Sequence, residues 1–181
     1  MTEIRWYRSW PKHPSAGPAR DHPHVYDHLP RILIDQYDYA TAVTVAGTES
    51  SPRLPYDKPG FCLLEWDIAL SSDERQRFAA KAMQRPDSVL VAPYMLYGID
   101  GNPECAHRFI AHGDPIGEGW PVCETFGFGC IYLPSLVIGR FMQDAVTDLG
   151  MTDASFSRYV FHAYGPTTVD WSFHPQHLSG D

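Results

Sequence analysis

Residues 61–67 read Phe61-Cys62-Leu63-Leu64-Glu65-Trp66-Asp67, and the rest of the fold can be predicted outward from them. The first four residues form an unbroken apolar run, which is typical of a central strand covered on both faces. Two acids follow immediately, so Glu65 and Asp67 are expected at the carboxyl end of that strand. Residues two apart at a strand end project to the same side, and in open α/β sheets ligands bind at this edge. We therefore expect both carboxylates to face one ligand.

Helical and extended patterns alternate along the chain after this strand. A capping-box spacing at residues 71–74 predicts a helix that continues to about Arg85. The other expected elements are strands over residues 88–95 and 167–171, a glycine turn that runs into a strand over residues 126–132, and helices over residues 133–148 and 153–164. Thr152 and Gly165 are residue types that cap the beginning and the end of the last helix.

The chain before residue 61 gives weaker patterns. Ile4 to Arg8 predicts a first strand. Apolar residues at a helical period predict a helix from Val25 to Tyr37, and the β-branched stretch from Thr41 to Ala46 predicts a strand.

This alternation predicts an α/β fold with a mostly parallel central sheet flanked by helices. The length of 181 residues suits a single domain, with enough chain to bury a core and form a cleft. Hydrophobic residues make up 44% of the chain and charged residues 20%, which is ordinary for a globular protein. No repeat or linker divides the sequence.

The net charge of −8 bears on the class of ligand. Lysines and arginines are scattered, whereas a protein that grips nucleic acid through its phosphates needs a basic stripe. The sequence thus argues against stable nucleic-acid binding, and its acidity suits a bound cation that itself holds a phosphate.

The sequence also predicts a cytoplasmic protein without a membrane span. No apolar run approaches the roughly 20 residues that cross a bilayer, and the first residues lack the apolar centre of a signal peptide. The four cysteines form no C-x-x-C pair, so we expect buried free thiols, with a disulfide or a zinc knuckle as the alternative.

Glu65 and Asp67 predict a site for Mg²⁺ or Mn²⁺, because carboxylates hold these ions together with substrate phosphates. Such a site needs further ligands, and His174 and His177 follow the last expected strand. If this tail folds back over the sheet edge, either histidine could reach an ion held by Asp67. The alternatives are solvated acids in a turn and two surface histidines.

Gly127-Phe128-Gly129 precedes a strand and carries neither of the two common phosphate-binding patterns. The chain contains no G-x-G-x-x-G and no G-x-x-x-x-G-K-[ST], which argues against a Rossmann dehydrogenase and a P-loop kinase. The two glycines let the backbone pass close to a sugar or ribose, or they form a plain tight turn.

Asp153 follows the expected cap Thr152 and therefore lies in the first turn of a helix. The helix dipole favours a negative charge there. Asp153 is read either as a helix-end acid or as a catalytic base.

Taken in order, these motifs resemble the GT-A glycosyltransferases. The likeness consists of an apolar strand ending in acid-x-Asp, a glycine turn into strand and helix, an acid that opens a helix, and a late histidine. It spans about Phe61 to His177. The resemblance implies a short GT-A-like domain over residues 1–181, with residues 1–60 as the nucleotide-binding part and residues 61–181 as the metal, acceptor and catalytic part.

The resemblance also implies roles for individual residues. Asp67 would bind the divalent ion that bridges the diphosphate of a nucleotide-diphosphate sugar, Glu65 would contact ribose or an ion-bound water, and one tail histidine would complete the metal site. Asp153 would take the acceptor's proton, and the nucleotide base would lie near Trp10. The other expected donor-binding residues are Trp66, Gly127 and Gly129.

Two further classes of function use the same residues. One is a metal-dependent hydrolase or phosphoesterase, and the other is a non-catalytic binding domain with surface acids. For the glycosyltransferase, the acceptor stays open between a protein hydroxyl, a small molecule, a glycan and a modified nucleobase.

Overall fold

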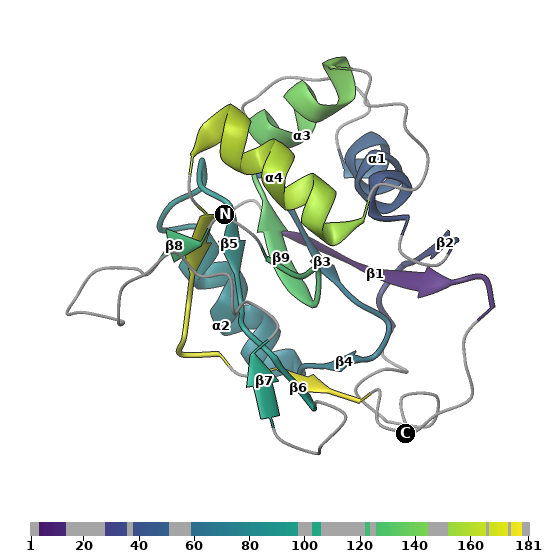
Figure 1. The fold of residues 1–181 in the computed structure, drawn as a ribbon, viewed down its shortest axis with the longest axis vertical. Coiled ribbons are helices and arrows are strands. Elements are labelled where there is room, and N and C mark those ends of the chain that lie inside the picture. Colours follow the sequence, from purple (N-terminus) through teal and green to yellow (C-terminus); the bar gives the residue numbers. More distant parts are fainter. Residues whose placement is uncertain are drawn as a thin grey trace.

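The computed structural model describes residues 4–13, 28–35, 38–50, 59–97, 103–105, 122–123, 126–144, 152–165, 167–173 and 175–178. Its centre is a seven-stranded sheet (Figure 1). In spatial order the strands are β2 (Arg31–Ile34), β1 (Arg5–Pro11), β3 (Phe61–Leu64), β9 (Cys130–Leu133), β5 (Leu90–Val91), β10 (Thr167–Val169) and β8 (Val122–Cys123). All run in one direction except β9 and β8, so the predicted mostly parallel α/β sheet is confirmed.

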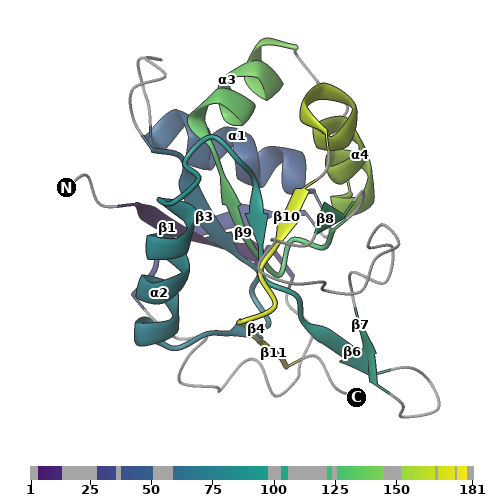
Figure 2. The ribbon, with the colours of Figure 1, turned by 90° about the vertical axis from the view of Figure 1, so that its left-hand side faces the viewer.

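Helices cover both faces of this sheet (Figure 2). One face carries α1 (Tyr39–Ser50), α3 (Ser135–Gln143) and α4 (Asp153–Tyr164), and the other carries α2 (Ser72–Ala82). Two small ribbons stand apart from the sheet: β4 (Ile68–Ala69) pairs with β11 (Gln176–His177), and β6 (Met95–Tyr97) pairs with β7 (Pro103–Cys105).

Strand β3 is completely buried, as its apolar run predicts. Phe61 and Leu63 belong to the core beneath α1, α3 and α4, whereas Cys62 and Leu64 belong to the core beneath α2. Its neighbours are β1, which is parallel, and β9, which is antiparallel. The chain therefore leaves the middle of the sheet directly into Glu65.

Of the elements expected before residue 61, the first strand is confirmed as β1, and the helix and the strand that were expected after it are wrong. Residues 31–34 form the edge strand β2 instead of part of a helix, with alternating exposed and buried residues. The stretch from Thr41 to Ala46 lies in helix α1 instead of a strand. Asp38 starts that helix by accepting hydrogen bonds from the amide and the hydroxyl of Thr41, at 3.2 and 2.6 Å. Tertiary packing of Ala42, Val43 and Ala46 against the sheet outweighs the β-propensity of the valines and threonines.

The later helices follow their sequence signals closely. Ser71 and Glu74 form the predicted capping box, in which each side chain bonds the other residue's backbone amide. Thr152 caps α4 by accepting from the amide of Ser155, and Gly165 ends it with a φ of 86°. Local contacts thus fix both the beginning and the end of α4.

The described helices include none with both the length and the apolar character needed to cross a bilayer.

Candidate functional site

The carboxyl ends of the parallel strands meet at one edge of the sheet. Glu65 and Asp67 follow β3, Tyr94 follows β5, and Asp170 follows β10. Strand β9 is antiparallel and begins at the same edge, so the Gly127–Gly129 turn that leads into it also lies there. This edge is where open α/β sheets bind ligands.

The two acids lie in a tight turn and not in an extended strand. The amide of Ile68 donates to the carbonyl of Glu65 at 3.2 Å, which closes the turn directly after β3. Alternation of side chains therefore does not apply, and the two carboxylates contact different partners. Asp67 is also buried, with 6% of the residue exposed.

Asp67 lies beside His177. The Nε2 atom of His177 is 3.4 Å from Oδ2 of Asp67, and the two side chains are 11% and 8% exposed. Pairing of β11 with β4 brings the histidine there, because His177 is opposite Ile68 and the amide of Leu178 donates to the Asp67 carbonyl at 2.8 Å. The last part of the chain does fold back over the sheet edge.

Tyr94 fixes the other side of His177. The two rings are stacked, with centroids 5.4 Å apart and planes 8° apart. Tyr94 also fills the space beside the glycine turn, since a Cβ atom at Gly129 would lie 2.2 Å from its Cε1 and one at Gly127 would lie 2.5 Å from its hydroxyl. Close packing of Tyr94 against the turn thus accounts for both glycines, for which the sequence left open a contact with a sugar or ribose and a plain tight turn.

Glu65 is held by a residue on the face of the sheet that carries α1, whereas Tyr94 packs on the other face. The hydroxyl of Tyr39, the first residue of α1, donates to its carboxylate. The Tyr39 ring stacks on Phe128 at 4.5 Å, and Phe128 packs against Phe156 of α4 at 5.1 Å. A continuous row of aromatic side chains therefore connects Glu65 to the first turns of α4, the helix that Asp153 opens.

Arg8 lies beneath the acidic turn and is completely buried. Its Nη1 donates to the carbonyls of Glu65 and Ile68, at 2.7 and 3.0 Å. Arg8, Tyr39 and Tyr94 were not among the site residues expected from the sequence. Arg8 could have been noticed in the sequence, because it lies in the strand expected over Ile4 to Arg8. A charged residue within a strand of a buried sheet needs hydrogen-bond partners inside the protein.

Trp10 and Trp66 form an aromatic corner next to Asp67. Their rings meet edge to face at 6.0 Å, and Ala69 and Leu178 complete the cluster. The guanidinium of Arg31, on the edge strand β2, lies 4.1 Å from the centre of the Trp10 ring. The residue expected near the nucleotide base is thus close to the acidic turn.

Two expected site residues cannot be placed in full. His174 lies outside the described residues, and of Asp153 the structure describes the backbone in α4 but not the side chain.

Cys62 and Cys130 are buried free thiols, as expected. Burial raises the pKa of both above the ordinary thiol value, and the nearby charge of Arg8 opposes that rise at Cys130. Neither thiol is suited to act as a nucleophile.

Asp67 and His177 have the spacing of two ligands of one divalent ion. Two ligands that each bind one ion at about 2.1 Å lie no more than about 4.2 Å apart, and the observed 3.4 Å is within that limit. Carboxylate and imidazole both suit Mn²⁺, which commonly takes its other ligands from phosphate and water. Among the described residues no three His, Cys, Asp or Glu side chains gather around one point.

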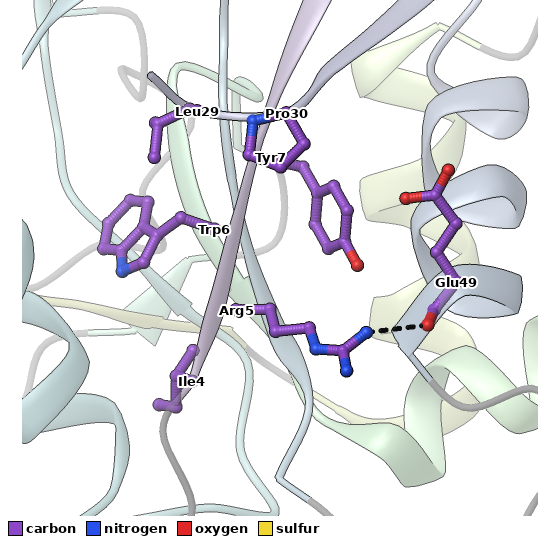
Figure 3. A pocket seen from close by; sticks show the side chains of 7 residues that line it. All are labelled: Ile4, Arg5, Trp6, Tyr7, Leu29, Pro30 and Glu49. Carbon is purple, nitrogen blue, oxygen red and sulfur yellow. Dashed lines mark hydrogen bonds between the residues drawn. The ribbon is translucent and has the colours of Figure 1, made fainter. Parts of the chain in front are cut away.

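A cavity of about 560 Å³ lies away from these residues, around the amino-terminal half of β1 (Figure 3). Trp6 and Tyr7 line it from opposite sides of the strand, and Arg5 reaches the carbonyl of Glu49 at 2.8 Å. Strand β1 begins here beside the first residue of β3, so the cavity is at the end of the sheet opposite to Glu65.

Comparisons with known proteins bear on the fold. No protein-family model matches the chain, and neither does any curated protein. Among solved structures, the chain is similar to the crystal structure of A197 from STIV, with a TM-score of 0.61 and 13% sequence identity. The match covers 98% of this chain and 87% of that one, and at this identity it shows a shared α/β fold.

Proposed function

We propose that this chain is a cytoplasmic, metal-dependent glycosyltransferase that moves a sugar from a nucleotide-diphosphate sugar to a hydroxyl acceptor. The observation that best supports the proposal is the Asp67–His177 pair. Asp67 follows the central strand β3, and Nε2 of His177 lies 3.4 Å from its carboxylate. The pairing of β11 with β4 places His177 there.

Each part of the site has a task in this reaction. Asp67 and His177 would hold Mn²⁺ or Mg²⁺, and the ion would supply positive charge that stabilises the leaving diphosphate. Trp10 and Trp66 offer an aromatic surface for the nucleotide base. Asp153 takes the acceptor's proton, and its place at the beginning of α4 favours the ionised form.

A thermal-shift panel of nucleotide sugars, with and without MnCl₂, tests the proposal. A ligand at about 100 times its dissociation constant stabilises a protein by about 2.7 kcal/mol, which for this length raises Tm by about 5–11 °C. We expect such a shift only with Mn²⁺ present, and we expect Asp67→Asn to lose it.

Asp170→Asn is the matched control. Asp170 is also a buried acid at the carboxyl end of a parallel strand, but its carboxylate accepts from the amide and hydroxyl of Ser172. This variant should keep the full Mn²⁺-dependent shift. An Asp67→Asn protein that bound the donor like the parent would contradict the proposal.

Activity assays then separate the classes of function. Release of nucleoside diphosphate on addition of an acceptor supports a transferase. Turnover of a phosphoester without an acceptor would instead identify a metal-dependent hydrolase, and stable ligand binding without turnover would identify a binding domain.

A further inference from the structure

Arg8 is a charged residue that is completely buried. Arginine is rarely fully buried unless its charge has partners, yet none of Arg8 is exposed. Its guanidinium donates to Glu65 and Ile68, which are the first and last residues of the turn that carries Asp67. Because these two residues also hydrogen-bond each other, one side chain secures both ends of the turn.

Strand pairing explains how Arg8 reaches this place. β1 and β3 are parallel, and Arg8 lies opposite Leu64, the last residue of β3. The strand next to the central one thus supplies a donor where the central strand ends. Without that donor, two buried carbonyl groups would lose charge-assisted hydrogen bonds, and the turn would relax to satisfy them in another way.

We propose that Arg8 is the positioning residue of the metal site: it fixes the Glu65–Ile68 turn so that the Asp67 carboxylate stays beside His177. The inference rests on the proposed function, because it concerns the same site. If Arg8 is removed, the loss of its positioning role and the loss of its charge should change the metal affinity in opposite directions. A positive charge repels a cation, so removing Arg8 would tighten metal binding if only its charge mattered. Loss of positioning weakens metal binding instead.

The experiment measures Mn²⁺ affinity from the electron paramagnetic resonance signal of the free ion, together with Tm, for the parent, Arg8→Met and Arg8→Lys. Loss of a partner that orients a metal ligand typically costs about 10–100-fold in affinity, and we expect that range for Arg8→Met. Lysine keeps a donor but lacks the planar fork, so Arg8→Lys should fall between the parent and Arg8→Met.

Tyr132→Phe controls for a general loss of stability. The Tyr132 hydroxyl accepts from the amide of Gly60 at 3.2 Å and donates to the carbonyl of Pro86 at 2.9 Å, at the opposite end of the sheet. Its removal should lower Tm and leave Mn²⁺ affinity unchanged. If the Arg8 variants bind Mn²⁺ more weakly than Tyr132→Phe at a similar Tm, the weaker binding arises from a change in the metal site and not from a general loss of stability.

The outcomes separate this inference from the proposed function. A parent protein that does not bind Mn²⁺ contradicts the proposed function itself. A parent that binds, with Arg8 variants that bind as tightly or more tightly, overturns the role of Arg8 and leaves the metal site intact. If Arg8→Met does not fold, Arg8→Lys decides alone: weaker binding supports the inference, and unchanged affinity overturns it.

Discussion

Replacing Gly129 with alanine should disturb the contact that holds His177. A Cβ atom at this position would lie 2.2 Å from Cε1 and 2.4 Å from Cδ1 of Tyr94, so the ring has to move. Because Tyr94 is buried, with 6% of the residue exposed, and its ring is stacked on His177, the ring has little room to move without displacing the imidazole. The substitution thus acts on the candidate metal ligand through one intervening side chain.

Overpacking of this kind costs about 1–3 kcal/mol of unfolding free energy. For a chain of this length, that corresponds to a decrease in Tm of about 2–12 °C. Mn²⁺ affinity should fall as well, by about 10-fold or more, because the histidine no longer lies beside Asp67.

Thermal denaturation and Mn²⁺ titration of Gly129→Ala and Gly165→Ala form the assay. Gly165 has a φ of 86° and a ψ of −166°, a backbone conformation that is essentially restricted to glycine, and no heavy atom near its missing Cβ, so alanine there adds about 1–3 kcal/mol of backbone strain without touching the site. This control should lose stability and keep its Mn²⁺ affinity.

A Tyr94→Leu background completes the cycle. The smaller side chain leaves space for the new methyl group, so the stability cost of Gly129→Ala should shrink by about 1 kcal/mol or more. Our account of the glycine turn would be refuted if Gly129→Ala cost nothing, or cost as much with leucine at position 94 as with tyrosine.

Three further predictions concern other elements. Ser71→Ala removes one half of the capping box with Glu74 and should lower the unfolding free energy by about 1 kcal/mol, measured by urea denaturation; no change would show that α2 does not need its cap. Asp153→Asn should keep donor binding in titration calorimetry and lose roughly 100-fold in transfer rate, and full activity would reduce it to a helix-end acid. Burial raises the pKa of Cys62 and Cys130, so iodoacetamide at pH 8 should leave both unmodified in peptide mass spectrometry until the protein unfolds. Because these thiols ionise more easily in the unfolded chain, the free energy of unfolding is unaffected below the ordinary thiol pKa of about 8.5 and falls as the pH rises above it. Rapid alkylation of the native protein would contradict the buried placement of both cysteines.

The sequence predicted the centre of the fold well because local signals there agree with the tertiary structure. The apolar run of residues 61–64 requires burial on both faces, and the capping residues Ser71, Thr152 and Gly165 act within a few residues of themselves. Short-range hydrogen bonds and backbone conformation decide such positions, so they can be read from a single segment.

The rest depended on contacts between distant segments. Valines and threonines between Thr41 and Ala46 favour a strand locally, but packing against the sheet and the Asp38 cap make the segment helical. The approach of His177 to Asp67 depends on the pairing of two very short strands, which no local pattern specifies. The tight turn at Glu65 likewise follows from the Arg8 side chain, which comes from another strand.

The central claim is that Asp67 and His177 together bind a divalent ion. A crystal structure of the protein soaked with MnCl₂ and a nucleoside diphosphate, with data collected at the manganese absorption edge, tests it most directly. We expect an anomalous peak within about 2.0–2.3 Å of both an Asp67 carboxylate oxygen and Nε2 of His177, with diphosphate oxygens completing the coordination. Manganese at another place, or a diphosphate-bound structure in which His177 still contacts Asp67 with no ion between them, would contradict it.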